Sequence, residues 1–131
     1  MDRPFQFSGR IRSFQHAFAG IRTMLESQHN AWIHGAATIV VCLAGWYCGL
    51  ARSEWCWIIA AIVAVWVAEA LNTAFEFLAD AASPEFHPLV KQAKDVAAGA
   101  VLIAAVGSII TGALIFGPRV ASLLSSGTSG Q

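Results

Sequence analysis

The sequence predicts an all-α membrane protein with three membrane-spanning helices and an N-terminal amphipathic helix on the membrane surface. Hydrophobic residues make up 56% of its 131 positions and charged residues only 12%, whereas a soluble domain carries about 25% charged residues. Three long apolar runs follow residue 30, and about 20 residues are enough for a helix to cross the hydrocarbon core. We therefore expect residues 1–131 to form a single membrane domain.

The surface helix is expected at about residues 10–28. Apolar side chains recur there at steps of three and four residues and fall within an arc of about 80°. These side chains are Ile11, Phe14, Phe18, Ile21 and Leu25. Such a helix lies at the membrane interface or packs as the first helix of a bundle, and both can hold together. The flanking segments 1–9 and 125–131 are polar chain ends and are expected to be disordered.

The three spans are expected at about residues 31–51, 55–81 and 89–117. The first run contains one histidine, His34, and no Lys, Arg, Asp or Glu, and residues 96–116 of the third contain no charge. The second run is wholly apolar only over residues 55–68. Its helix must therefore continue through polar residues to about residue 80 to reach the length of a span.

Lysine and arginine residues predict the orientation, because they concentrate in the short cytoplasmic segments of membrane proteins. Six lie before the first span or between the second and third, and two lie on the other side. The six are Arg3, Arg10, Arg12, Arg22, Lys91 and Lys94, and the two are Arg52 and Arg119. The N-terminus and the second connection are therefore predicted to be cytoplasmic. The net charge of zero gives no indication of a nucleic-acid partner.

A polar stripe interrupts the end of the second span, in the segment AEALNTAFEFLAD. Glu69, Asn72, Glu76 and Asp80 are spaced three, four and four residues apart, so on a helix they share one face about 16 Å long. A charge at membrane depth costs at least about 2.5 kcal/mol, and such residues usually line a site. A stripe that merely faces bulk water suits Asp80 but suits Glu69 poorly, since only fourteen apolar residues precede it.

The segment HPLVKQAKDVAAGA is predicted to bring a second polar face to the same depth. Lys91, Lys94 and Asp95 share one side of the third helix, which we expect to start near Pro88. Carboxylates bind Mg²⁺, lysine neutralises phosphate, and a carboxylate without a ligand can take a proton from a hydroxyl. No G-x-x-x-x-G-K-[ST] phosphate loop is present. The residues alone thus predict a cytoplasmic polar site suited to metal and phosphate, without specifying a reaction.

A stripe of small residues on the third span predicts close helix packing. Ala100, Ala104, Ser108 and Gly112 recur every four residues, and small residues let membrane helices approach each other closely. The stripe packs either between subunits or within one.

These motifs resemble the prokaryotic diacylglycerol kinase and undecaprenol kinase family of small membrane lipid kinases. The pattern E-x-x-N-[ST]-A-x-E-x-x-x-D, followed by H-x-L-x-x-x-A-K-D, is matched at every fixed position. R-S-F-x-H-A-F-x-G-I before the first span and N-A-W-I-H at its start match as well. The resemblance covers about residues 10–118.

The resemblance implies a homotrimer in the bacterial cytoplasmic membrane, with each active site built across a subunit boundary. It implies transfer of the γ-phosphate of ATP, with Mg²⁺ as cofactor, to the hydroxyl of a membrane lipid. Glu69 would act as general base beside the lipid, and Glu76 would bind metal at the ATP site. Many members have a second metal-binding glutamate where this chain has Gln28, whose neutral carbonyl oxygen is a weaker ligand.

The resemblance also implies the rest of the ATP site and the lipid contacts. The nucleotide residues would be Arg10 and His16 of the surface helix, Asn72 and Asp80 of the second span, Glu85, Phe86 and His87 of the connection, and Lys94 and Asp95 of the third span. Arg12 and Ala98 would contact the lipid, where small residues leave room for a chain or simply pack helices. His29 and His34 are interpreted as structural.

Two alternative functions are a carboxylate-lined ion or proton pathway and a non-catalytic membrane protein. A pathway needs polar groups across the whole membrane, yet residues 55–68 and 96–116 contain none that ionise within the bilayer. Among lipid substrates, the segment HPLVKQAKDVAAGAVL, the Asn72-Thr73 pair and the IFGP end favour undecaprenol, with diacylglycerol as the alternative.

Overall fold

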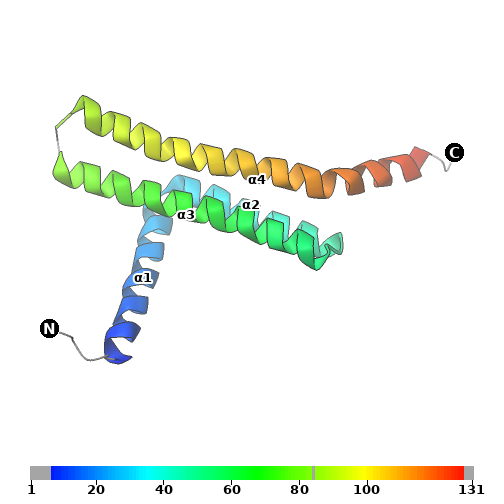
Figure 1. The fold of residues 1–131 in the computed structure, drawn as a ribbon, viewed down its shortest axis with the longest axis horizontal. Coiled ribbons are helices and arrows are strands. Elements are labelled where there is room, and N and C mark those ends of the chain that lie inside the picture. Colours follow the sequence, from blue (N-terminus) through cyan, green and yellow to red (C-terminus); the bar gives the residue numbers. More distant parts are fainter. Residues whose placement is uncertain (1–6, 84, 129–131) are drawn as a thin grey trace.

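The computed structural model describes residues 7–83 and 85–128, and within them the chain forms four helices and no strand. The helices are α1 (Phe7–Ser27), α2 (His29–Tyr47), α3 (Arg52–Ala82) and α4 (Pro88–Thr128). Figure 1 shows α2, α3 and α4 side by side along one axis, while α1 runs off to one side, away from α4. The predicted all-α fold is confirmed.

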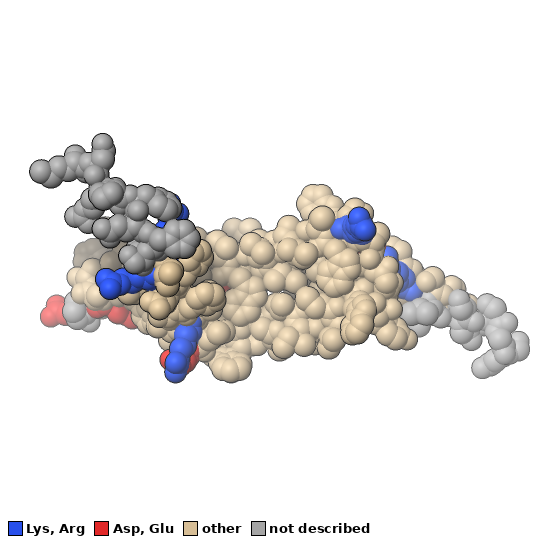
Figure 2. All heavy atoms as spheres, turned by 90° about the horizontal axis from the view of Figure 1, so that it is seen from below, with Lys and Arg blue, Asp and Glu red and all other residues tan. Residues whose placement is uncertain are grey.

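Among the described residues, two helices, α3 and α4, are long and apolar enough to cross a membrane. Large hydrophobic side chains such as Leu71, Ile103 and Leu114 are exposed along them, as expected where lipid is the solvent. In Figure 2 an uncharged belt separates charged side chains at the two ends of the molecule. The helix α2 has 19 residues and starts with polar side chains, so a third crossing by α2 stays a prediction.

The helix ends differ from the sequence prediction at several points. The first predicted span, 31–51, is a helix only from His29 to Tyr47, because a turn occupies the following residues. The last predicted span, 89–117, continues as helix through Pro118 to Thr128. The predicted disordered tail therefore starts inside a helix. Of the segments predicted to be disordered, residues 1–6 and 129–131 lie outside the described residues.

The turn between α2 and α3 depends on two glycines. Gly49 has φ of +62°, a left-handed conformation that glycine adopts without strain after a helix end. Gly45 is buried, and its backbone carbonyl accepts a hydrogen bond from the Leu50 amide at 3.1 Å. A Cβ atom added at Gly45 would lie 2.9 Å from the ring of Trp55 and 3.0 Å from Leu50. Close packing at this turn therefore requires a residue without a side chain.

The pairing of α3 with α4 is fixed at both ends and in the middle. Arg119 forms two hydrogen bonds to the Glu54 carboxylate, at 2.9 and 2.8 Å, and Lys94 pairs with Asp80 at the opposite end. Between them Ser108 of the small-residue stripe donates to the Ala61 carbonyl of α3 at 3.2 Å. At this position the stripe packs within the chain.

The helix α3 is the centre of the fold. It packs against each of the other three helices within the described part of the chain. An apolar cluster of Leu50, Ile58 and Ile115 lies toward the Glu54–Arg119 end. Any side chain on the buried face of α3 is therefore held between α2 and α4.

We predict that Gly45→Ala destabilises the fold by about 1–3 kcal/mol, because the new methyl group overlaps a rigid indole ring. Thermal unfolding in detergent micelles measures the effect. Gly35→Ala in the same helix is the matched control, since its Cβ would lie an ordinary 4.0 Å from Trp66. Equal melting temperatures for the two variants would show that the turn tolerates the added atom.

Candidate active site

The polar stripe predicted on the second span lies along α3, and its burial decreases toward the C-terminal end of the helix. Glu69 has no exposed surface and Asn72 is 5% exposed. Glu76, two turns after Glu69, is half-buried, and Asp80 is exposed. One helical face therefore extends from the dry interior of the bundle to its polar end.

Glu69 is a buried carboxylate that lacks hydrogen-bond partners. Neither of its carboxylate oxygens accepts a hydrogen bond within the described residues. The side chain faces a cavity of about 270 Å³ that residues of α2, α3 and α4 line together, with Ala98 and Val101 of α4 among them. A buried charge without hydrogen-bond donors is costly. A polar group that enters the cavity and donates to Glu69 would therefore stabilise the carboxylate.

Glu76 differs from Glu69 because two amides satisfy it. Asn72 Nδ2 donates to Glu76 Oε1 at 3.1 Å, and Gln28 Nε2 donates to Glu76 Oε2 at 2.7 Å. Gln28 reaches α3 because it occupies the break between α1 and α2, where its backbone is extended (φ −112°, ψ 116°). The residue that departs from the family pattern thus lies directly against the expected metal ligand.

These three side chains supply oxygen atoms of the kind that Mg²⁺ prefers. Asn72 Oδ1 is buried and has no hydrogen-bond partner, and a half-turn of the Gln28 amide would present its carbonyl oxygen in place of its nitrogen. Within residues 7–83 and 85–128 no group of three His, Cys, Asp or Glu side chains gathers as a metal site. One carboxylate with two amides fits a Mg²⁺ ion that takes its other ligands from water and phosphate.

The lysines of α4 are paired with acidic groups near the same end of the bundle. Lys94 Nζ lies 2.9 Å from Asp80 Oδ1 of α3, and Lys91 Nζ lies 2.6 Å from Asp95 Oδ2 of its own helix. Lys94 therefore contacts the outermost carboxylate of the stripe rather than Glu69 or Glu76. Both pairs are partly exposed, so an anionic ligand can compete for the ammonium groups.

Two groups of expected site residues lie apart from this cluster. Glu85, Phe86 and His87 are exposed in the connection between α3 and α4, where His87 Nδ1 accepts the Leu89 amide at 3.3 Å. Arg10, Arg12 and His16 are exposed on α1, which leads away from α4 (Figure 1). The structure brings neither group to Glu69.

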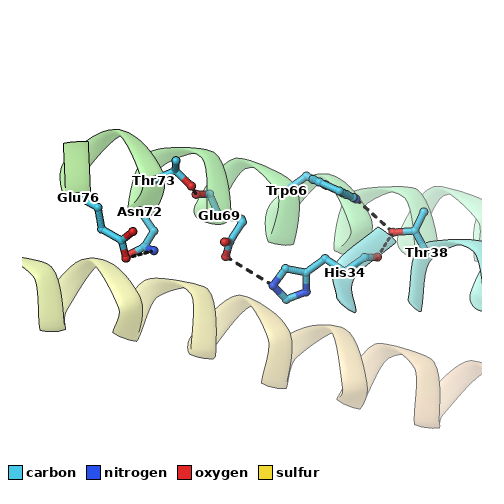
Figure 3. A network of polar contacts seen from close by, with 7 residues as sticks. All are labelled: His34, Thr38, Trp66, Glu69, Asn72, Thr73 and Glu76. Atoms are coloured by element: carbon cyan, nitrogen blue, oxygen red, sulfur yellow. Dashed lines mark hydrogen bonds and ion pairs between the residues drawn. The ribbon is translucent and has the colours of Figure 1, made fainter. Parts of the chain in front are cut away.

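Sequence reasoning set aside one residue that the structure places beside Glu69. His34 Nε2 of α2 lies 3.6 Å from Glu69 Oε2 (Figure 3). The signal in the sequence was that His34 is the one His, Lys, Arg, Asp or Glu residue in the apolar run 31–50. Periodicity within one helix does not reveal which side chain of another helix it meets.

Comparison with known proteins identifies the family. The model for prokaryotic diacylglycerol kinase matches residues 15–116. An undecaprenol kinase of Bacillus subtilis is 41% identical over 110 residues, which cover 84% of this chain and 89% of that protein. A diacylglycerol kinase of Synechocystis is 34% identical over 113 residues, or 86% of this chain and 65% of that protein. For a diacylglycerol kinase of Escherichia coli the identity is 26% over 105 residues, or 80% and 86%.

The chain belongs to the prokaryotic diacylglycerol kinase family. It is therefore a lipid kinase, a phosphotransferase with an alcohol acceptor, and α3 and α4 are candidate membrane spans by their length and composition. The alternative of an ion or proton pathway is not favoured. In this lipid kinase the buried carboxylate, the amide-bound carboxylate and the lysine-bound carboxylate follow one another on α3, which is an arrangement suited to a hydroxyl, a metal ion and phosphate in turn.

Proposed function

We propose that this lipid kinase transfers the γ-phosphate of ATP to the hydroxyl of undecaprenol, with Glu69 as general base. The observation that carries the proposal is the Glu69 carboxylate, which is fully buried, has no hydrogen bond within the described residues and faces a cavity between three helices. An alcohol is the neutral donor that such a carboxylate needs. The choice of undecaprenol rests on the Bacillus subtilis relative, which is more similar than the two diacylglycerol kinases.

In the proposed reaction each polar residue of α3 has a separate task. Glu69 takes the proton from the lipid hydroxyl as the oxygen bonds to the γ-phosphorus, and the bond from that phosphorus to ADP breaks. A Mg²⁺ ion held by Glu76, with Gln28 and Asn72 beside it, would neutralise charge on the phosphates. Lys94, released from Asp80, would contact a phosphate, and Asp95 and residues 85–87 would border the nucleotide.

We further propose a homotrimer of three-span subunits, with the N-terminus and the site on the cytoplasmic side of the bacterial inner membrane. The arginine distribution supports this orientation. The position of α1 supports a site shared between subunits. Arg10 lies about 25 Å along α1 from Ser27, the end of the helix that adjoins α2. Arg10, Arg12 and His16 would then serve the phosphates and lipid of a neighbouring subunit, because α1 carries them away from their own Glu69.

Vesicles that contain undecaprenol and diacylglycerol together test the activity and the lipid in one assay. With Mg²⁺ and radiolabelled ATP, we expect undecaprenyl phosphate to be the main product. Glu69→Gln is expected to lower turnover by about 10²- to 10⁴-fold because it removes the base. The fold should persist, since a neutral amide is cheaper to bury than a carboxylate without partners.

The controls in this assay separate the parts of the proposal. Melting curves of wild type and Glu69→Gln establish that both are folded. A strong preference for diacylglycerol would overturn the choice of undecaprenol and leave the kinase unchanged. Full turnover by folded Glu69→Gln would refute the assignment of the base, and no labelled lipid of either kind would refute the proposed reaction.

Gln28→Glu is predicted to lower the Mg²⁺ concentration needed for half-maximal activity by about tenfold, because a second carboxylate adds charge to the ligand set. Without Mg²⁺ the same variant should melt at a lower temperature than wild type, since the new carboxylate would face Glu76 at the present 2.7 Å contact. Gln28→Leu is the control that removes the amide and adds no charge. An unchanged Mg²⁺ dependence in both variants would exclude Gln28 from the metal site.

The trimer is predicted to show a detergent-corrected mass three times that of the 13.9 kDa chain. Co-assembly of Arg12→Ala with Glu69→Gln subunits should restore part of the activity that each variant lacks alone, because some sites would then combine two intact halves. A single-chain mass, or failure of mixed assemblies to regain activity, would contradict a site shared between subunits.

A further inference from the structure

The buried carboxylate has a partner on α2 that the proposed reaction does not yet use. Glu69 Oε2 lies 3.6 Å from His34 Nε2. Within the described part of the chain, Glu69 makes its ion-pair contact with this imidazole. The side chain of Glu69 has no exposed surface and that of His34 is 16% exposed. Both atoms are therefore removed from water and face each other (Figure 3).

Neither His34 Nε2 nor the Glu69 carboxylate has a hydrogen-bond partner among the described residues. His34 Nε2 and both carboxylate oxygens of Glu69 are buried and unpaired within residues 7–83 and 85–128. A hydrogen bond from an imidazole N–H to a carboxylate is charge-assisted and stronger than a neutral one. The separation of 3.6 Å is slightly longer than such a bond.

The backbone of His34 is held in place by α3 itself. Thr38 Oγ1 donates to the His34 carbonyl at 2.7 Å, and Trp66 Nε1 of α3 donates to Thr38 Oγ1 at 3.1 Å. Trp66 lies one helical turn before Glu69 on the same helix. As Figure 3 shows, one end of this chain of contacts anchors α2 to α3, and the other end places the imidazole against the carboxylate.

The surroundings of the pair contain no competing charge. His34 and Glu69 line the same cavity of about 270 Å³. The described residues that complete its lining are Asn30 of α2, Asn72 of α3, and Ala98, Val101, Leu102 and Ala105 of α4. None of them titrates, so α4 contributes an apolar wall and the electrostatic partner of Glu69 comes from α2.

We propose that His34 is the positioning residue for Glu69, an inference that rests on the proposed role of Glu69 as base. His34 Nε2–H donates to Glu69 Oε2, which fixes the orientation of the carboxylate and leaves Oε1 directed at the substrate. During transfer the proton of the lipid hydroxyl moves to Oε1, the alkoxide oxygen bonds to phosphorus, and ADP leaves. His34 keeps its own proton throughout and acts only through Glu69.

Three substitutions at His34 test this inference in the lipid assay. His34→Leu removes the donor and should lower kcat on the order of 10- to 100-fold, the scale at which supporting partners of reactive groups act. The KM for ATP should not change, because nucleotide residues are untouched. His34→Gln places an amide N–H near the position of Nε2 and should restore most of the lost kcat. His34→Asn, whose shorter amide stops near the position of Nδ1, should not.

The same substitutions in the Glu69→Gln background separate positioning from packing. If His34 acts through Glu69, the residual turnover of Glu69→Gln is the same with His, Gln or Leu at position 34. If His34→Leu does not fold, the comparison of His34→Gln with His34→Asn tests the inference instead. Melting curves establish that these two variants are folded.

Each outcome of this set has a defined meaning. Wild-type kcat in His34→Leu, or equal losses in folded Gln and Asn variants, would overturn the positioning role while an inactive Glu69→Gln still upheld the base. An active Glu69→Gln would instead refute the proposed function on which the inference rests. The inference is supported if His34→Gln, but not His34→Asn, restores kcat, and if substitutions at position 34 do not change turnover in the Glu69→Gln background.

Discussion

The structure depends on one costly feature, a carboxylate with no exposed surface in a helix that is long and apolar enough to cross a membrane. Glu69 can be kept there only if neighbouring helices enclose it, because lipid offers no donor to a charged oxygen. The fold meets this constraint by placing α3 between α2 and α4, so that His34 lies on one side and small or apolar residues of α4 lie on the other. The most unfavourable residue of α3 thus occupies its most protected position.

Enclosing Glu69 requires that α3 and α4 keep a fixed register over their whole length. A membrane provides little hydrophobic driving force between helices, so polar contacts and close packing must hold the pair. Glu54 with Arg119 and Asp80 with Lys94 connect the two helices at opposite ends, and Ser108 bonds to the α3 backbone between them. Because these contacts lie about two to four helical turns from Glu69 along α3, they can set the depth of the cavity without occupying it.

The sequence predicted the polar stripe because helical periodicity within one element is a local property. Residue spacing alone placed Glu69, Asn72, Glu76 and Asp80 on one face, and family motifs supplied their expected roles. The sequence could not assign partners, since the contact of Gln28 with Glu76 and that of His34 with Glu69 join residues far apart in the chain. The end of α4 was missed for a different reason. Pro118 and the polar residue after it are typical of a helix end, yet α4 continues through them to Thr128.

The order of partners along α3 suggests how one helix can separate a proton, a metal ion and a phosphate. The fully buried carboxylate lies 3.6 Å from an imidazole, the half-buried one accepts two neutral amides, and the exposed one is paired with an ammonium group. A cation bound near Glu69 would compete for the charge that a general base needs, whereas a cation near Glu76 meets oxygen ligands and open space. The degree of burial therefore determines which partner each carboxylate can bind. Each carboxylate further along α3 is easier to hydrate and easier for a charged partner to reach.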